Sequence, residues 1–321
     1  MKNRIALAIV RDVKIYECIV EELICMGFEV DLFLAFSNSN ISYIDKKINS
    51  ILKRINVQRK DKKIIILKQA YEKDLMERIR SYDYGLVIRP DAFGVDFLYK
   101  LNERTGKTIA YQWDGMARFV GAEERLGYFD KFYVYEDGDT VKYPGTFKAG
   151  NFYFNNVIRV FKNNEKRYDA YYLGTFDARI GKIIEVCEAL LHAGLSLDIK
   201  IPCSDKNKKA LEDYPYINTD RVSYAYRENL RMVSHSSVVL DFGHDNLHEG
   251  LSFRPFEAMG FGLKCITTNP IISVQEFYNG NNYLYYSEDT DIRGFLSRPY
   301  LYDPCVENYS FSSWIERYLL D

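Results

Sequence analysis

The stretch from Val238 to Asn269 constrains the fold of this chain more than any other part of its sequence. An apolar run from Val238 to Leu240 opens the stretch, a polar loop and a short helical segment follow, and a β-rich run begins at Cys265. Two strands joined through a helix form a βαβ unit, in which the strands run parallel. The sequence therefore predicts a parallel α/β sheet in this part of the chain.

The helix between those two strands has clear signals at both ends. Ser252 is a favourable N-cap residue, and Pro255 lies within the first turn, where its missing N–H costs little. Gly260 and Gly262 end the helix. In parallel sheets ligands bind at the carboxyl ends of the strands, and a helix N-terminus at that edge attracts phosphate. We therefore expect an anion site where this helix begins.

Two glutamates, Glu249 and Glu257, flank this helix start eight residues apart, and Glu257 is followed by Ala258 and a Gly-x-Gly stop. Here the chain resembles the nucleotide-sugar site of the group-1 glycosyltransferases, which are retaining enzymes with the two-Rossmann GT-B fold. The resemblance implies that Glu257 binds the ribose hydroxyls of the donor and that Glu249 lies beside the transferred sugar. Carboxylates suit this work because they accept hydrogen bonds from both hydroxyls of a diol. The alternative is an exposed helix face for Glu257 and an ordinary loop position for Glu249.

A second apolar run, from Tyr168 to Leu173, leads into Gly174 and Thr175. It resembles the first strand of the C-terminal domain in that family, where a glycine turn brings a basic residue onto the donor diphosphate. Arg179 is the stronger candidate for this cation, because its spacing of three from Lys182 departs from the family spacing of about five. A fixed cation there stabilises the charge that develops on the leaving diphosphate. For Lys182 the alternative is a solvated helix face.

The helix start and the loop before it supply further donor-site candidates. Ser252 and Phe253 open the helix, and Arg254 lies in its first turn, where a cation is unfavourable unless an anion compensates it. Arg254 is therefore predicted to bind a phosphate or a sugar carboxylate, with a surface salt bridge as the alternative. His244 in the loop is a candidate proton donor or charge partner near a diphosphate, or else a hydrogen-bonding bystander.

The N-terminal part of the chain also has the pattern of a Rossmann-like layer. Residues 5–10 form a continuous apolar run, residues 13–26 repeat apolar positions at helical spacing, and residues 28–36 form a second strand. The turn after the first strand contains no glycine, so a dinucleotide fingerprint is absent and we expect no NAD. Further along we expect a short strand over Ile64 to Leu67 and a helix over Glu72 to Ser81.

Two later strands of this part end in polar tips, Arg89 with Asp91 and Gln112 with Asp114. We expect both tips at the carboxyl edge of the sheet, facing an interdomain cleft. Asp114 is the candidate for acceptor positioning or acid/base catalysis. The alternative is turn chemistry, since Asp before Gly often hydrogen-bonds its own backbone.

A different glycosyltransferase fold, GT-A, offers a competing interpretation. Asp137 and Asp139 match the spacing of the acidic pair that holds Mn²⁺ or Mg²⁺ on the donor diphosphate in GT-A enzymes. Acidic pairs of this kind are common by chance, and Asp-Gly after a strand is an ordinary turn. We therefore expect neither a metal nor a cofactor, and the nucleotide-sugar donor is expected as a substrate.

Chain length and hydrophobic content limit the number of domains that the chain can form. The 321 residues, 47% of them hydrophobic, are enough for two domains. We expect an N-terminal Rossmann-like acceptor domain over 1–155 and a nucleotide-sugar-binding domain over 156–305. A C-terminal helix over 306–321 completes the chain and, in the fold that the sequence resembles, crosses back to the first domain.

Net charge and the cysteine pattern indicate which partners the protein binds and in which cellular compartment it works. The net charge of −2 favours no nucleic acid, and six scattered cysteines without metal-ligand spacing indicate reduced thiols in the cytoplasm. The N-terminus lacks a signal-peptide pattern, and no apolar run is long enough to span a membrane. The 20 Phe and 27 Tyr leave room for aromatic patches that contact a membrane peripherally, at its inner face.

The resulting hypothesis is a metal-independent, retaining GT-B glycosyltransferase of bacterial surface polysaccharide or lipopolysaccharide biosynthesis. Its acceptor would be a glycan or a lipid-linked glycan. Two alternatives remain at this point: a metal-dependent GT-A enzyme using Asp137 and Asp139, and a non-catalytic pair of nucleotide-binding Rossmann domains.

Overall fold

The computed structural model describes residues 2–37, 57–119, 121–162, 164–243 and 250–321, without the side chains of residues 57–64. Its contacts divide the chain into two compact units: residues 1–12 with 26–149, and residues 13–25 with 150–321. Each unit contains a six-stranded sheet whose paired strands are parallel. The predicted α/β class with two Rossmann-like units is confirmed.

The sheet of the first unit has the strand order β2-β1-β3-β4-β5-β6. Its strands are β1 (Arg4–Ile9), β2 (Glu29–Leu34), β3 (Tyr82–Ile88), β4 (Thr105–Gln112), β5 (Lys131–Val134) and β6 (Thr146–Lys148). Residues Ile5 to Ile9 are fully buried, as expected for a parallel strand covered on both faces. The direction of winding reverses between β1 and β3, so a ligand crevice is expected beyond their carboxyl ends.

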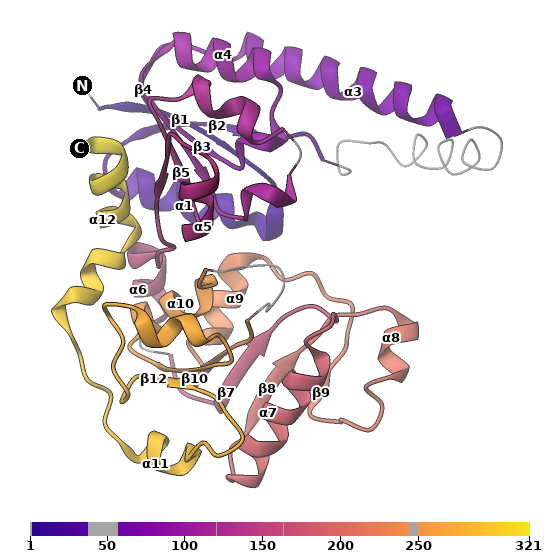
Figure 1. Cartoon of the computed structure of the whole chain (residues 1–321), viewed down its shortest axis with the longest axis vertical. Helices are drawn as coiled ribbons and strands as arrows, with labels where there is room; N and C mark the ends of the chain where they lie inside the picture. The colour runs from indigo at the N-terminus through magenta and orange to yellow at the C-terminus, as the bar shows by residue number, and fades with distance from the viewer. Residues whose placement is uncertain (1, 38–56, 120, 163, 244–249) are drawn as a thin grey trace. The chain divides into compact units, whose positions relative to one another are not determined.

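The helices of the first unit include α3 (Val57–Glu77), α4 (Val95–Glu103) and α5 (Asp137–Lys142) (Figure 1). Helix α3 covers the region where we predicted a strand over Ile64 to Leu67, so that prediction is wrong. Ile65 and Ile66 are 51% and 63% exposed, whereas Leu75 near the other end of the helix is 1% exposed. The run of apolar residues is therefore not a buried strand, and flanking Lys, Gln and Glu residues favour the helix.

The sheet of the second unit has the order β12-β11-β10-β7-β8-β9. Its strands are β7 (Tyr168–Leu173), β8 (Leu197–Lys200), β9 (Ile217–Asn218), β10 (Ser236–Asp241), β11 (Lys264–Thr267) and β12 (Tyr283–Tyr285). Strands β10 and β11 pair in parallel from Val238 with Lys264 to Asp241 with Thr267, which confirms the predicted βαβ unit. Counted from β7, this is the doubly wound order 3-2-1-4-5-6, with its switch point between β7 and β10.

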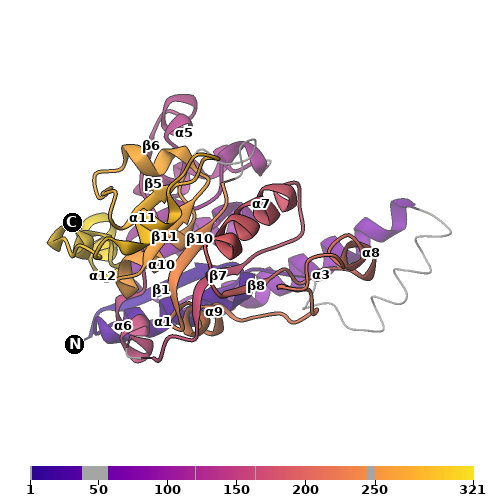
Figure 2. The same ribbon diagram turned by 90° about the horizontal axis from the view of Figure 1, so that it is seen from below.

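Helices pack on both faces of this second sheet, with α7 (Ile180–His192) and α11 (Ile292–Ser297) on one face and α9 (Tyr226–Val233) and α10 (Phe253–Phe261) on the other (Figures 1 and 2). The second unit also contains α1 (Ile15–Cys25), α6 (Asn155–Phe161), α8 (Asp205–Lys209) and α12 (Phe311–Ile315). Tyr172 of β7 packs in the core beneath α7, and its neighbour Tyr171 donates a hydrogen bond to Asn229 of α9. The side chains of the successive residues Tyr171 and Tyr172 thus point to opposite faces of the sheet.

Helix α1 comes from the N-terminal end of the sequence but packs in the second unit, against α6, α9 and α12. Its Glu22 is fully buried, and one carboxylate oxygen accepts the backbone N–H groups of Asn156 (2.7 Å) and Val157 (3.1 Å). The other oxygen accepts the Asn156 side-chain amide at 2.6 Å. Glu22 thereby satisfies first-turn donors of α6. Burial raises the pKa of Glu22, although these hydrogen bonds oppose the increase.

The C-terminal segment also packs within the second unit. The predicted terminal helix is present as α12, which continues as a π-helical segment, Glu316–Leu320. The rings of Phe311 and Trp314 lie 4.9 and 5.4 Å from the ring of Phe152, and the Trp314 indole donates to the Gly150 carbonyl at 3.0 Å. This aromatic cluster packs the C-terminal segment against residues 150–152, where the chain enters the second unit.

Replacing Glu22 tests the attachment of α1. We expect Glu22→Ala to lower the free energy of unfolding by about 2 kcal/mol, because buried N–H groups of α6 lose their acceptor. The neighbouring Glu21→Ala removes a half-exposed ion pair with Arg227 and should cost less than about 1 kcal/mol. Urea unfolding of both variants measures the difference. Equal losses in the two variants would show that Glu22 does not hold α1 on α6.

Candidate functional site

The carboxyl ends of β7 and β10 mark the crevice that the strand order predicts for a ligand. Strand β7 ends at Leu173 and is followed by Gly174, and β10 ends at Asp241. Helix α10 begins at Phe253 and ends where Gly262 adopts a left-handed φ of 67°, in agreement with the predicted glycine stop. Gly174 has no room for a side chain, because a Cβ there would lie 2.1 Å from the Tyr172 hydroxyl.

The Asp241 carboxylate fixes the start of α10 against the sheet. The hydroxyl of Ser252, the predicted N-cap residue, donates to one Asp241 oxygen at 2.7 Å and accepts the N–H of Arg254 at 3.1 Å. The other Asp241 oxygen accepts the hydroxyl of Thr267 on β11 at 2.8 Å. Since Asp241 is only 1% exposed, these bonds satisfy a carboxylate that would otherwise be costly to bury. One side chain thus connects β10, α10 and β11.

Glu257 lies one turn into α10 and is only 3% exposed, so the alternative of an exposed helix face is wrong. One of its oxygens, Oε1, accepts the Tyr226 hydroxyl at 2.6 Å and the Asn229 amide at 3.3 Å, both from α9. The other oxygen, Oε2, has no hydrogen-bond donor among the residues that the structure describes. Burial raises the pKa of Glu257, opposed by Tyr226, Arg254 and Asn229. The site therefore holds a buried acceptor oriented by one oxygen, with the second oxygen available to a ligand.

Arg254 finds protein partners for the charge that its position in the helix makes unfavourable. Its guanidinium donates to the Leu173 carbonyl at 2.7 Å, lies 3.8 Å from Asp241 and covers the ring of Tyr172 at 4.9 Å. The side chain is still 25% exposed. A surface salt bridge does not describe this arrangement, because Asp241 is buried. The predicted contact with a donor phosphate stays a prediction.

Arg179 is bound tightly to its neighbour Asp177. The guanidinium donates to both Asp177 oxygens, at 2.9 and 2.6 Å, and to the Phe242 carbonyl at 2.9 Å. The hydrogen bonds from Arg179 hold the pKa of Asp177 well below its usual range. Thr175 also donates to Asp177, at 2.9 Å. Arg179 therefore joins the end of β10 to the turn after β7, and its charge is already balanced before any diphosphate binds.

Lys182 differs from the other predicted cations of this site. Its ammonium pairs with Glu185 at 2.6 Å on the same helix, and its side chain is 47% exposed. This is the solvated helix face that the sequence offered as the alternative. The predicted contact of Lys182 with a diphosphate is untested.

Two predicted residues, His244 and Glu249, lie outside the described residues. The two residues that follow Glu249 accept hydrogen bonds through their backbone carbonyls. Asn269 donates to the Gly250 carbonyl at 3.0 Å, and Asn151 donates to the Leu251 carbonyl at 2.9 Å.

In the first unit, Asp114 belongs to an arginine-centred cluster. Its two oxygens accept from Arg89 at 2.8 Å and from Arg118 at 3.1 Å, rather than from its own backbone. Arg89 also binds both oxygens of Asp91, at 2.7 and 2.9 Å, and lies 3.5 Å from the ring centre of Phe119. With φ of 61°, Arg89 adopts a left-handed conformation that is unusual for a residue other than glycine.

Asp12, three residues after the end of β1, is influenced electrostatically by this cluster. Burial raises its pKa, Arg89 lowers it, and the nearby Asp114 and Asp91 raise it further. Gln112, predicted as a polar tip beside Asp114, is fully buried instead. The cluster thus lies at the β1/β3 switch point of the first sheet and brings Asp91 and Asp114 together as expected at that carboxyl edge.

The acidic pair of the GT-A interpretation is divided between two structural roles. Asp139 is 5% exposed and accepts the Met116 N–H at 2.8 Å, whereas the side chain of Asp137 is 79% exposed and lies 3.1 Å from Lys148. Among the described residues no group of three or more His, Cys, Asp or Glu is placed to hold a metal ion. Two six-stranded parallel sheets also differ from what that interpretation requires, and the structure gives it no support.

The sequence did not reveal several residues that build the site. Tyr226 and Asn229 lie in the segment 223–230, whose resemblance to the family segment near the nucleotide base is too loose to assign a role to either residue. Asp241 and Asp177 gave no signal beyond following a strand, because their partners are hydroxyl and guanidinium groups that come together only in the fold.

Comparison with known proteins adds similarities in structure only. No protein-family model matches the sequence, and no curated protein matches it at a significant level. An alpha,alpha-trehalose-phosphate synthase (UDP-forming) from Burkholderia vietnamiensis is similar, with 9% identity over 83% of this chain and 84% of that one and a TM-score of 0.48. UGT73P12 of Glycyrrhiza uralensis, complexed with glycyrrhetinic acid 3-O-monoglucuronide, has 9% identity over 83% and 76% and a TM-score of 0.42.

An alpha1,3-fucosyltransferase is similar at 10% identity over 85% of this chain and 71% of that one, with a TM-score of 0.36. Likenesses at this level carry no argument about activity. Within the described residues, no helix is long and apolar enough to cross a membrane.

Glu257→Gln separates a ligand-binding role from a structural one. Because the folded-state pKa is raised, the carboxyl stabilises the fold most below its ordinary value of 4.5, and this contribution is lost as the pH rises through the folded-state pKa. Glutamine still accepts from Tyr226 and Asn229 but never ionises. We therefore expect the variant to be more stable than the wild type at pH 8, by an amount that shrinks toward pH 4.5.

Urea unfolding at several pH values measures this difference, with Glu316→Gln at an exposed position as the control. A variant that is less stable than the wild type at pH 8 would mean that ionised Glu257 supports the fold itself.

Proposed function

We propose that this protein is a glycosyltransferase that moves a sugar from a nucleotide-sugar donor to a glycan or lipid-linked glycan acceptor. The donor binds in the second unit, beyond the carboxyl ends of β7 and β10. One observation carries the proposal: Glu257 is buried near the start of a helix beside the switch point, with one oxygen held by Tyr226 and Asn229 and the other without a donor in the described part of the chain. A site built to receive hydroxyl hydrogens fits this arrangement.

The ribose of the donor supplies those hydroxyls. A buried carboxylate that loses water must be compensated by hydrogen bonds, and a vicinal diol offers two donors to it. Tyr226 and Asn229 orient the carboxylate before the ligand arrives, so little ordering is left to the binding step. This supports the role for Glu257 that the resemblance implies.

The diphosphate of the donor would lie near the first turn of α10. That turn offers fewer backbone donors than most, because Ser252 already accepts the N–H of Arg254 and Pro255 has none. The helix dipole and the guanidinium of Arg254 therefore supply most of the attraction for an anion. Arg179 lies at the end of β10, where charge on the leaving group develops, but its positive charge is already paired with Asp177.

The acceptor would bind in the first unit near Asp114, whose cluster lies at the switch point of that sheet. Retention of configuration, metal independence and the roles of Glu249 and His244 rest on the resemblance and belong to the proposal. Binding without turnover is the second candidate function. The pairing of Arg179 with Asp177 favours it, because a cation that is already balanced stabilises a leaving group less.

Nucleotide binding tests the donor site directly. We expect one nucleoside diphosphate among UDP, GDP, CDP and dTDP to bind the wild type in isothermal titration calorimetry. Glu257→Gln should weaken that binding about 10- to 100-fold, because hydrogen bonds to a charged group are lost. Glu316→Gln, at an exposed position on the C-terminal segment, should bind like the wild type. Absence of binding by every nucleotide, or equal affinity in Glu257→Gln, contradicts the proposal.

Turnover distinguishes an enzyme from a nucleotide-binding protein. Incubation with UDP-, GDP-, CMP- and dTDP-sugars should release free sugar slowly from one donor, and EDTA should leave the rate unchanged. Product is measured by liquid chromatography. Tight nucleotide binding without any release would favour the non-catalytic function, and loss of activity in EDTA would show that metal is required.

A further inference from the structure

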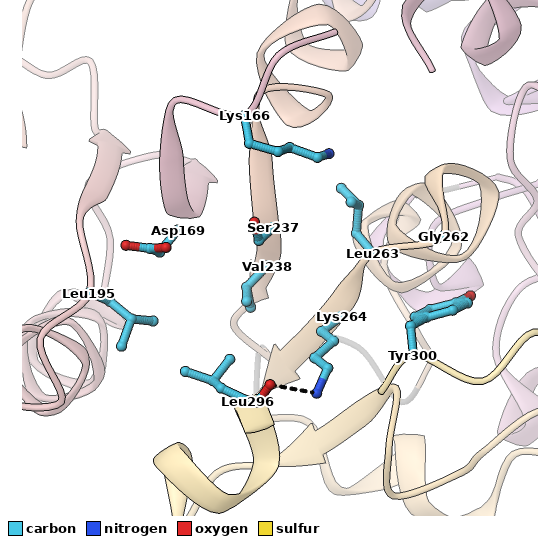
Figure 3. Close-up of a pocket in the computed structure, with 10 residues that line it drawn as sticks. All are labelled: Lys166, Asp169, Leu195, Ser237, Val238, Gly262, Leu263, Lys264, Leu296 and Tyr300. Carbon is cyan, nitrogen blue, oxygen red and sulfur yellow. Dashed lines mark hydrogen bonds between the residues drawn. The ribbon is translucent and has the colours of Figure 1, made fainter. Parts of the chain in front are cut away.

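A pocket lies at the amino ends of β10 and β11, opposite the carboxyl ends at which the donor site is proposed (Figure 3). It has a volume of roughly 400 Å³, within the range of small-molecule sites. Its walls come from the start of β10, from Gly262 at the end of α10 and from Lys264 at the start of β11. Strand β10 has six residues, so the two sites are separated by roughly 17–20 Å.

The walls of this pocket combine apolar surface with two ammonium groups. Its apolar lining comes from Leu195, Val238, Leu263, Leu296 and the ring of Tyr300. Among the described residues, neither Lys166 nor Lys264 forms a salt bridge with a carboxylate. The lining therefore contains two ammonium groups and one carboxylate, that of Asp169, with no salt bridge between them.

The two lysines play different parts. The Lys264 ammonium is buried and donates to the carbonyls of Phe295, of Leu296 at 3.3 Å and of Arg298 at 2.7 Å, which uses all three of its N–H groups. Within the described part of the chain Lys166 donates once, to the Ser234 carbonyl at 3.0 Å, which leaves two of its N–H groups for a ligand. Figure 3 shows its ammonium extended toward Leu263. Desolvation lowers the pKa of both lysines, although Lys264 is buried and Lys166 is exposed to solvent.

The one carboxylate in the lining does not neutralise these charges. An oxygen of Asp169 accepts both the N–H and the hydroxyl of Ser196, each at 2.7 Å. In Figure 3 this carboxylate points away from Lys166. The pocket consequently combines one exposed, hydrogen-bonding cation with a largely apolar lining.

We propose that this pocket binds a small anion with an aliphatic body, held at its charged end by Lys166. The free N–H groups of Lys166 bind a carboxylate or phosphate oxygen, and the leucines and Val238 cover the aliphatic part. This site goes beyond the proposed transferase function and shares no lining residue with the donor site.

Octanoate titrated into the full chain by calorimetry tests the proposal, with 1-octanol and inorganic phosphate as partial ligands. We expect saturable octanoate binding with Kd of about 0.1–1 mM and at least fivefold weaker binding of either partial ligand. Lys166→Met keeps the aliphatic stem and should weaken octanoate about tenfold. Ser237→Phe should block the pocket. Lys206→Met, at an exposed position of α8, should change nothing.

Three outcomes overturn the proposal: no saturable octanoate binding, equal octanoate affinity in Lys166→Met, or equal binding of 1-octanol and octanoate. Unchanged octanoate affinity in Ser237→Phe would place any binding elsewhere and overturn it as well. Glu257→Gln should bind octanoate like the wild type. Failure of the nucleotide experiments and failure of this one are therefore distinguishable.

Discussion

The proposed donor site of the second unit depends on the hydrogen bonds that the buried Asp241 carboxylate accepts. It receives the Ser252 hydroxyl and the Thr267 hydroxyl on separate oxygens, so the end of β10, the start of α10 and the end of β11 are held together. Its negative charge also compensates the Arg254 guanidinium 3.8 Å away, in a helical turn where a cation is otherwise unfavourable. A helix positioned this way presents its next turn, and therefore Glu257, at a fixed place beside α9.

Glu257 is a buried carboxylate that two protein hydrogen bonds orient before a ligand binds. Tyr226 and Asn229 satisfy one oxygen, which is enough to orient the side chain, whereas no donor from the residues that the structure places compensates the desolvation of the other oxygen. The raised pKa of Glu257 records this incomplete compensation. Proteins retain such groups where function requires them, at some cost in stability. The arginine-centred cluster of the first unit also contains a feature that costs stability. Arg89 adopts a left-handed backbone conformation, which the surrounding fold must stabilise.

Local signals in the sequence predicted the parts of this fold that short-range physics determines. The βαβ unit, the Ser252 N-cap, the glycine stop of α10 and the buried first strand were all visible, because each depends on residues close in the chain. The strand over Ile64 to Leu67 was wrong, since a short apolar run cannot by itself distinguish a strand from a helix. Pairings between distant segments, such as Glu22 with Asn156 and Glu257 with Tyr226, leave no pattern in a single sequence. The pocket around Lys166 was invisible for the same reason.

The most direct test of the account is a thermodynamic cycle between Glu257 and the ribose hydroxyls. The affinities of the nucleoside diphosphate that binds and of its 2′,3′-dideoxy analogue would be measured for the wild type and for Glu257→Gln. If the free oxygen of Glu257 binds the diol, removing either partner removes the same interaction, and the two changes should couple by about 1–3 kcal/mol. Additive changes, with coupling near zero, would mean that Glu257 and the ribose do not meet.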